Sequence, residues 1–296
     1  MGLRQQIQYS LKRIQTSQFF SDDDLYTTLV DDLVTLGTSI GLTAITPPWT
    51  SMYTDGDTQN FHTDAKHGPM AFVLSLAQAG DFRGGETMLL QPTLLDYWRK
   101  FETTTALECQ QIVRYIPATT PFGRCLAFDP RVPHGVTPVI GSQDPRKARV
   151  VVHGWFNAPE CCWFGTWRED NEDEDEDGDD DEDEAGESSR TTTLDAALEP
   201  LVATLGRGEI GRVMGYLAAR LEVDADGTIA EVYAVCDTLQ ADPDDHRGVI
   251  GYDEDGQEIL EDAAGDIRLT VYESLKTLQF ETGAHGRACV VPFVFE

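Results

Sequence analysis

Short apolar stretches separated by polar turns dominate the chain between residues 71 and 156. Clusters of Gly, Pro and Asp bound each stretch, and the lengths are typical of antiparallel strands. The stretches cover residues 71–76, 87–90, 111–116, 124–128 and 148–156. Before them, apolar residues recur at helical spacing from Leu25 to Leu36, between a capping sequence at 21–24 and Gly37, which predicts one helix that Gly37 ends. This part of the chain is therefore predicted to be mainly β with flanking helices.

A different pattern follows after residue 190. An amphipathic helix is predicted at 194–205. Two strands at 216–223 and 228–235 flank the sequence Asp-Ala-Asp-Gly, which is typical of a hairpin turn. An acidic, glycine-bearing loop comes next, then a helical pattern at 266–278 and an apolar final strand at 288–295. The order strand, strand, helix, strand predicts a small α+β (ββαβ) domain with its helix on one face of the sheet.

Charge changes the picture between these two regions. Residues 169–187 hold 15 acidic side chains and no basic one, which accounts for half of the formal net charge of −30. Such a block cannot bury apolar area and repels itself, so we expect a disordered acidic linker at 168–190. A solvated spacer is favoured over a tail that binds calcium or a basic partner. The predicted domains are then 1–167 and 191–296.

Composition excludes several classes of partner. The chain has 52 acidic and 22 basic residues, which argues against nucleic acid or an anionic membrane surface as a partner. No apolar run approaches the roughly 18 to 20 residues of a membrane span. The first twenty residues lack an apolar core and a cleavage site, so no secretory signal is expected. Six cysteines without a Cys-x-x-Cys pair are expected to be reduced. These features predict a cytoplasmic protein.

Two histidines and an aspartate form the most informative pattern. His62 and Asp64 are two positions apart, so on a strand both side chains project to the same face. A distant third ligand, His134, would complete two imidazoles and one carboxylate on one side of an ion. That set leaves adjacent positions open for a bidentate cosubstrate and dioxygen on iron(II), whereas a structural zinc site leaves none. His-x-Asp alone is a weak pattern, for which a surface histidine or a capping aspartate is the alternative interpretation.

The surrounding motifs resemble those of a known family. Four motifs follow His62-x-Asp64 in a fixed order: Phe-x-Gly-Gly-Glu-Thr at 82–87, Gly-Arg-Cys-Leu-Ala-Phe at 123–128, Pro-His-Gly-Val at 133–136, and Arg149 six residues before Trp155. In this order, residues 50–157 closely resemble the iron(II)- and 2-oxoglutarate-dependent dioxygenases, in particular the prolyl 4-hydroxylase-like branch. The resemblance implies a double-stranded β-helix (jelly roll) with iron(II) held at its mouth by His62, Asp64 and His134.

The resemblance also implies roles for other residues. Arg149 would bind the distal carboxylate of 2-oxoglutarate, because a guanidinium can grip a carboxylate bidentately. A longer spacing after His134 than in many relatives keeps Arg146 and Lys147 as alternatives. Tyr53 and Ser75 are expected to contact the cosubstrate. His153, four residues after Arg149, is expected on the same inward side as Arg149, where a core histidine is favoured over one that reaches the pocket.

The activity implied is hydroxylation, because the carboxylate ligand is present where halogenating members have a small residue. The substrate is expected to be a prolyl or other protein side chain or a small amino-acid-like molecule, with 2-oxoglutarate and O2 consumed, succinate and CO2 released, and ascorbate as a further reductant. The alternative is a non-catalytic metal-binding scaffold whose C-terminal module recruits a protein partner. The presence of all three ligands and of Arg149 favours the enzyme.

The C-terminal part has a resemblance of its own. Residues 211–296 resemble the C-terminal domain of TonB and of gliding-motility proteins in the succession of hairpin, helix and final strand. The membrane anchor and periplasmic location of TonB are absent from the pattern, so energy transduction is not expected. The resemblance implies a module that binds a protein partner by strand pairing at a sheet edge. A homodimer through this domain, or a stabilising appendage, is the alternative.

Overall fold

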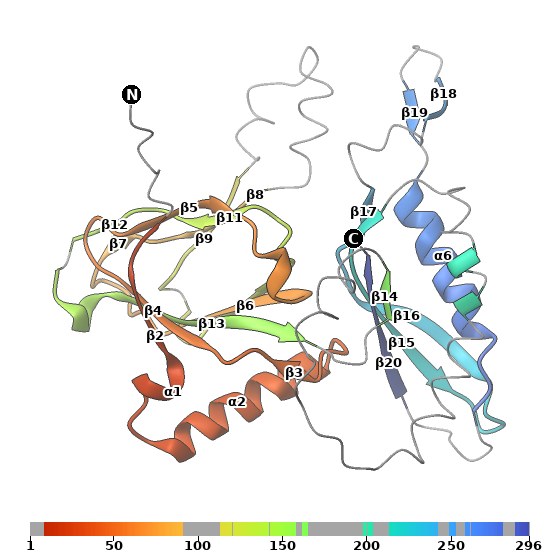
Figure 1. The fold of residues 1–296 in the computed structure, drawn as a ribbon, viewed down its shortest axis with the longest axis horizontal. Helices are drawn as coiled ribbons and strands as arrows, with labels where there is room; N and C mark the ends of the chain where they lie inside the picture. Colours follow the sequence, from red (N-terminus) through yellow and green to blue (C-terminus); the bar gives the residue numbers. More distant parts are fainter. Residues whose placement is uncertain are drawn as a thin grey trace, which may run out of the picture. The chain divides into compact units, whose positions relative to one another are not determined.

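The structure is a computed structural model in which two compact units are present, Met1–Thr38 with Leu42–Pro159 and Ser39–Gly41 with Glu160–Glu296 (Figure 1). Most of the regular structure is β-sheet, which confirms the mainly β prediction. The residues described are 9–90, 113–119, 121–141, 143–157, 162–164, 198–199, 201–203, 213–241, 249–252, 258–260, 262–280 and 288–295. The predicted acidic linker at 168–190 lies outside them. None of the helices in these ranges has the length and apolar character that a membrane crossing requires.

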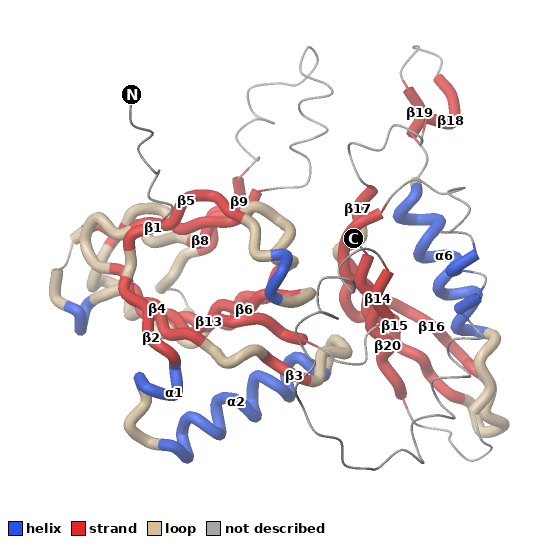
Figure 2. The backbone as a smooth tube through the Cα atoms, viewed as in Figure 1, coloured by secondary structure: helices blue, strands red, loops and turns tan. Residues whose placement is uncertain are grey.

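Two antiparallel sheets form the first unit, and Figure 2 shows them as two layers. One sheet has the order β1 (Tyr9–Ser10), β5 (Thr58–His62), β11 (His134–Val136), β8 (Thr87–Leu90), β9 (Val113–Ile116). The other has the order β10 (Cys125–Phe128), β6 (Met70–Ser75), β13 (Arg149–Asn157), β4 (Trp49–Tyr53), β2 (Lys12–Gln15), with β3 (Ala44–Ile45) also pairing with β13. A small third sheet pairs β7 (Arg83–Gly84) with β12 (Val139–Ile140). The five predicted strands therefore correspond to β6, β8, β9, β10 and β13.

The strand β13 is the centre of its layer. It lies between β4 and β6 and pairs with both, so its backbone groups are hydrogen-bonded on two sides. Its apolar residues are deeply buried, with Val152 and Phe156 at 0% exposure. Alternate residues Arg149, Val151, His153 and Trp155 line a cavity between the layers. The strand therefore serves both as core and as one wall of that cavity.

The N-terminal helices flank this unit. α1 covers Thr16–Phe19, and α2 covers Asp23–Thr38 with its first turn capped by Asp22, whose Oδ1 accepts from Leu25 N at 3.1 Å. The prediction that Gly37 ends the helix was wrong, because α2 continues through it. A Cβ at Gly37 would lie 2.5 Å from the Leu42 carbonyl oxygen and 2.8 Å from the Phe156 ring. This glycine allows close packing and does not terminate the helix.

In the second unit a sheet packs against the helix α6. Four strands of this sheet lie side by side in the order β14 (Cys162–Phe164), β20 (Ala288–Phe295), β15 (Val213–Val223), β16 (Ile229–Asp237), and β14 is parallel to β20. β17 (Gln240–Ala241) pairs with β15, and α6 covers Ala263–Lys276. The predicted turn between β15 and β16 is confirmed, with Gly227 at φ +87°. Where a loop was expected, β18 (Val249–Tyr252) and β19 (Glu258–Leu260) form a hairpin.

The predicted domain limits, 1–167 and 191–296, stay predictions. β14 belongs to the sheet of the second unit, although its residues fall within the predicted domain 1–167. Between β16 and α6 the structure adds β17, β18 and β19, so the expected succession of two strands, a helix and a strand stays a proposal. The likeness of the second unit to the TonB C-terminal domain also stays a proposal.

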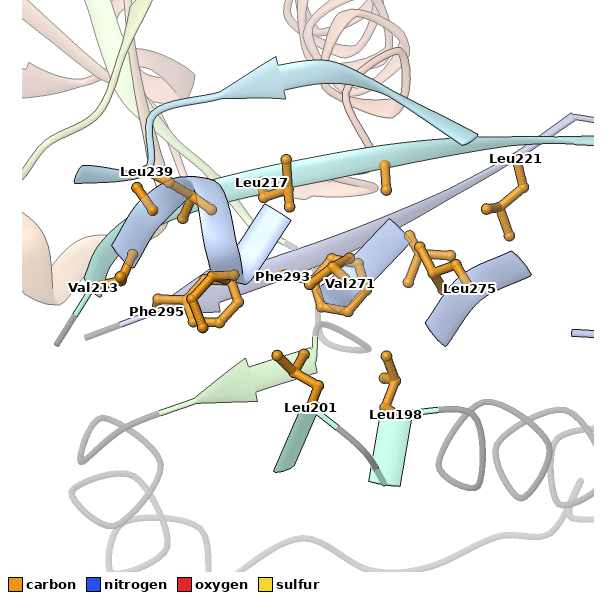
Figure 3. Close-up of a cluster of buried hydrophobic side chains, with 14 of the residues drawn as sticks. Leu198, Leu201, Val213, Leu217, Leu221, Leu239, Val271, Leu275, Phe293 and Phe295 are labelled. Atoms are coloured by element: carbon orange, nitrogen blue, oxygen red, sulfur yellow. The ribbon is translucent and has the colours of Figure 1, made fainter. Parts of the chain in front are cut away.

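One face of α6 supplies the core of the second unit (Figure 3). Ile267, Val271 and Leu275 recur at helical spacing and are fully buried against Leu217 and Phe293 of the sheet. Asp262 caps the helix by accepting a hydrogen bond from Gly265 N at 2.9 Å. The helix is therefore held mainly by its apolar stripe.

The substitution Ile267→Ala is expected to lower the free energy of unfolding of the second unit by about 2–5 kcal/mol, because it removes a fully buried side chain and leaves a cavity. Leu269→Ala is the matched control, since Leu269 lies on the same helix at 56% exposure and should change stability by less than about 0.5 kcal/mol. Urea denaturation followed by circular dichroism measures both. Equal effects of the two substitutions would contradict this core.

Candidate metal centre

The pairing of two short strands brings together three side chains that can bind a metal. His62 ends β5, His134 begins β11, and the two residues are direct partners in the antiparallel ladder. Asp64 Oδ2 lies 3.6 Å from His62 Nε2 and 3.5 Å from His134 Nε2. One ligand atom from each residue lies within 4.8 Å of the other two. The predicted metal-binding triad is thus brought together in space.

The route by which Asp64 reaches the site differs from the prediction. Strand alternation was expected to place it on the same face as His62, but β5 ends at His62. Asp64 lies beyond the strand, before the short 3-10 helix η1 (Ala65–His67), and its backbone N–H donates to Pro130 O at 3.0 Å. A turn, and not the period of a strand, therefore positions the carboxylate.

Backbone carbonyls orient both imidazoles. Nδ1 of His62 lies 2.9 Å from Asn60 O, and Nδ1 of His134 lies 2.9 Å from Val132 O. A carbonyl oxygen can only accept, so we assign the ring proton to Nδ1 in each neutral imidazole. The Nε2 lone pairs then face Asp64 and are available to an ion. Hydrogen bonds of this kind fix the tautomer of metal-binding histidines.

The electrostatics of the three residues favour a bound cation. Burial alone would raise the pKa of Asp64, but its contacts with His134 and His62 outweigh burial and hold that pKa well below the usual range. Burial would lower the pKa of His62, yet the hydrogen bonds with Asp64 and the Asn60 carbonyl raise it above 6.5. Asp64 is therefore an ionised carboxylate, and protons compete with a metal for His62. Two imidazoles and one carboxylate suit iron(II) with open coordination positions.

Arg149 is the second notable feature of the cavity. It is 2% exposed, its Nε donates to Gly85 O at 2.7 Å, and its Nη2 donates to Thr87 Oγ1 at 3.1 Å. Nη1 is buried and has no hydrogen-bond partner among the described residues. Burial lowers the pKa of Arg149, with the nearby Tyr53 acting against the shift. An arginine nonetheless stays charged, so this group requires an acceptor, and a carboxylate would supply it.

Two adjacent glycines make room for this guanidinium. Gly84 and Gly85 have φ of +70° and +69°, a region that favours glycine. A Cβ on Gly85 would lie 2.9 Å from Cδ of Arg149, and one on Gly84 would lie 2.1 Å from Pro138 O. Neighbouring atoms therefore approach both glycines more closely than a side chain would allow.

The other predicted site residues take different positions. Tyr53 is buried in the cavity wall, its ring centroid lies 4.7 Å from Cζ of Arg149, and its hydroxyl donates to Gln59 Oε1 at 3.0 Å. Ser75 is buried but does not line the cavity, and its hydroxyl donates to Ala118 O. Arg146 is exposed and pairs with Asp144 at 2.9 Å, with Lys147 beside it in the 3-10 helix η2 (Pro145–Lys147). Roles in cosubstrate binding stay predictions for Tyr53, Ser75 and Arg149.

Sequence patterns did not single out Gln59. Its Nε2 lies 3.0 Å from His62 Nε2, and its Oε1 accepts from the Tyr53 hydroxyl. Gln59 therefore links the candidate metal ligand His62 to Tyr53, which lies beside Arg149. Residues three apart on a regular strand face opposite sides, but the register between β5 and β11 shifts between His134 and Val136. This irregularity turns both Gln59 and His62 toward the cavity. The sequence around Gln59 contains no pattern that predicts this irregularity.

Metal binding is expected to weaken as the pH falls through the raised pKa of His62, because the ion must displace that proton. The apparent affinity should drop about tenfold for each pH unit below that pKa and level off above it. Titration with Co²⁺, followed by visible absorbance between pH 5.5 and 8.5, measures the effect. An affinity that does not change over this range would show that His62 is not a ligand.

Comparison with known proteins places these features beside one class of solved structures. Neither a family model nor a curated protein sequence matches the chain. A prolyl-4-hydroxylase from Pseudomonas putida is similar at 17% sequence identity and a TM-score of 0.35, and the match covers 52% of this chain and 74% of that one. A prolyl hydroxylase from Trichoplax adhaerens, solved with a hypoxia inducible factor peptide, is similar at 19% identity and a TM-score of 0.30, over 46% of this chain and 56% of that one. A 2OG-Fe(II) oxygenase family oxidoreductase from Burkholderia pseudomallei is similar at 15% identity and a TM-score of 0.26, over 37% of this chain and 41% of that one. Likenesses with TM-scores this low do not establish a function for the chain.

Proposed function

We propose that the first unit is an iron(II)- and 2-oxoglutarate-dependent dioxygenase built on a jelly roll. The observation that carries the proposal is a single cavity with two complementary features. His62, Asp64 and His134 converge on one side of it, and its wall holds the buried Arg149, whose Nη1 has no hydrogen-bond partner within the described ranges. A metal chelated by one end of 2-oxoglutarate, with Arg149 on the other end, would use both features.

Each residue has a distinct part in this proposal. His62, Asp64 and His134 would hold iron(II), which supplies the activation of dioxygen when it is bound. Arg149 would bind the distal carboxylate, with its guanidinium already fixed by Gly85 and Thr87, so little side-chain entropy is lost on binding. The two backbone carbonyls keep the imidazoles in the tautomer that coordinates.

The walls of the cavity would exclude water from the reaction. Phe72, Phe128, Val136 and Val151 line it together with the polar residues. A dry, apolar surrounding strengthens electrostatic contacts and protects reactive species from side reactions. The part of the cavity that neither the metal nor 2-oxoglutarate would occupy would then determine which substrate is oxidised.

The finer parts of the proposal rest on the sequence patterns. We propose hydroxylation of a prolyl or other protein side chain, or of a small amino-acid-like molecule, with release of succinate and CO2, in a cytoplasmic protein. Ascorbate as a reductant, Tyr53 and Ser75 as cosubstrate contacts, and a partner or homodimer through the second unit are further predictions. The second unit is proposed to be the TonB-like ββαβ module, with residues 168–190 as a spacer.

Conversion of 2-oxoglutarate to succinate tests the proposed function. The purified chain with Fe²⁺, O2 and 2-oxoglutarate is expected to form succinate, and removal of Fe²⁺ with EDTA should abolish it. Anaerobic titration of the Mn²⁺-loaded protein with 2-oxoglutarate measures binding without turnover. Binding of metal without binding of 2-oxoglutarate would instead support the non-catalytic scaffold.

A further inference from the structure

The sequence Asp-Pro-Arg occurs twice in the chain, beginning at Asp129 and at Asp144, and it folds in the same way each time. The Asp129 carboxylate accepts from the N, Nε and Nη2 of Arg131, at 2.9, 2.8 and 2.9 Å. The Asp144 carboxylate accepts from the same three groups of Arg146, at 3.0, 3.1 and 2.9 Å. The proline between the two residues has a fixed φ, so each set of bonds closes a tight and rigid turn. We call each set an Asp-Pro-Arg clamp.

The surroundings of the two clamps differ. The side chains of Asp129 and Arg131 are 5% and 13% exposed, whereas those of Asp144 and Arg146 are 32% and 89% exposed. Removal of two charges from water is costly, so a buried ion pair does not by itself stabilise a fold. An exposed pair contributes little in either direction. Stability alone therefore does not explain why the first clamp is buried.

The buried clamp lies in the turn between β10 and β11, and this turn holds two of the three candidate metal ligands. Pro130 O accepts from Asp64 N at 3.0 Å, and Val132 O lies 2.9 Å from His134 Nδ1. Within the turn, Val132 N donates to Asp129 O at 3.1 Å. The clamp therefore encloses the backbone whose carbonyls orient Asp64 and His134.

One peptide plane links the buried clamp directly to Asp64. The carbonyl of Pro130 and the N–H of Arg131 belong to the same peptide group, which is planar and rigid. Its N–H donates to the Asp129 carboxylate at 2.9 Å, and its carbonyl accepts from Asp64 N at 3.0 Å. In the exposed clamp, the corresponding carbonyl accepts from Ala148 N in its own turn, at 3.3 Å. A change in the first clamp is therefore passed to a candidate metal ligand, whereas the second clamp is bonded within its own turn.

We propose that Asp129 and Arg131 are positioning residues of the candidate metal centre, and that their clamp fixes Asp64 and His134 in the arrangement that binds an ion. Neither clamp residue lines the cavity, so both act through the turn and not by contact with the ion. Asp64 depends on this support most, because it lies beyond the end of β5 and outside the strand pairing. The inference rests on the proposed function only for the metal, and 2-oxoglutarate is not needed to test it.

Arg131→Gln is expected to weaken Co²⁺ binding about tenfold. Loss of a hydrogen-bond partner of a metal ligand typically lowers metal affinity about 10–100-fold, and here the partner carbonyls remain but lose their support. Charge alone predicts the opposite result, because removal of a nearby cation should strengthen the binding of a metal cation. Titration with Co²⁺, followed by visible absorbance, measures the affinity. The shape of the visible bands reports the coordination geometry, which a purely structural role of the ion pair would leave unchanged.

Two further variants separate lost positioning from lost folding. Asp129→Asn with Arg131→Gln removes both charges, so it leaves no buried charge unpaired and no change in net charge, and it should weaken Co²⁺ binding to a similar extent. Arg131→Lys keeps the ion pair but lacks the planar fork, so it should restore part of the affinity lost in Arg131→Gln. Asp144→Asn with Arg146→Gln is the matched control, because it breaks the same three bonds in the exposed clamp. This control should leave the affinity within about twofold of the wild type and the visible bands unchanged.

Wild-type affinity and visible bands in the folded variants of the buried clamp, or equal losses in the two double variants, would overturn the inference. Circular dichroism at the temperature of the titration shows whether each variant is folded. If the wild type binds Co²⁺ but not 2-oxoglutarate, the proposed function falls and the Co²⁺ titrations still test the clamp. If the wild type does not bind Co²⁺, the proposed function and the inference fall together.

Discussion

Substitution of His134 by Ala is expected to reduce metal affinity by more than about a hundredfold and to abolish succinate formation. Loss of an outer hydrogen-bond partner alone typically costs metal affinity 10–100-fold, and here a direct ligand is removed. Two ligands would remain, His62 and Asp64, which do not define one side of an octahedron. Calorimetric titration with Zn²⁺ or Mn²⁺ measures the loss.

His67→Ala is the matched control for this loss. His67 is a nearby exposed histidine that does not belong to the cluster of three possible ligands. Its removal should leave metal affinity within about threefold of the wild type. Because His134 is 7% exposed, His134→Gln, which keeps most of the side-chain volume, separates lost coordination from lost packing. Retention of metal binding by both His134 variants would refute the triad.

Substitution of Arg149 by Gln should weaken 2-oxoglutarate binding by a factor of about thirty to several thousand, while metal affinity stays nearly unchanged. Removal of one partner of a buried charged pair typically costs about 2–5 kcal/mol. Arg149 is the buried cation of the cavity, and its Nη1 has no other partner in the described part of the chain. Thermal shift gives a second readout, since 2-oxoglutarate should raise the Tm of the metal-loaded wild type and not that of the variant.

Arg146→Gln tests the alternative assignment. Arg146 is exposed and already pairs with Asp144, so its loss should leave 2-oxoglutarate binding unchanged. Arg149→Lys should restore only part of the affinity, because an ammonium lacks the planar fork that bonds a carboxylate through two parallel N–H groups. If Arg146→Gln has the larger effect, the cosubstrate is bound elsewhere and the proposed geometry is wrong.

Apolar periodicity was sufficient to predict most of the β-structure of the first unit. Strands such as β13, which pack on both faces, carry several apolar residues in succession, and such runs are visible in a sequence. The hairpin formed by β18 and β19 was missed because its sequence is acidic and rich in glycine, which resembles a loop. Pairing with a neighbour stabilises such strands, and local propensity does not report it.

Part of the candidate site was likewise predictable from the sequence, and part was not. His62, Asp64 and His134 were predicted from motif order, and the structure brings them within ligand distance of one another. The position of Asp64 on a turn and the contact of Gln59 with His62 were not predictable, since both depend on where β5 ends and on its irregular register with β11. Register is a property of two strands together, and a pattern read along one strand cannot contain it.

The direct pairing of His62 with His134 gives the metal a structural consequence as well. These residues come from distant parts of the chain and meet across two short strands of the same sheet, β5 with five residues and β11 with three. A cation bound by both histidines would link the two strands, as a disulfide links two segments of a secreted protein, but the link would be lost when the cation is removed. In the proposed iron complex, metal binding and the stability of this sheet would be thermodynamically linked, so removal of the metal should lower the stability of the sheet as well as the activity.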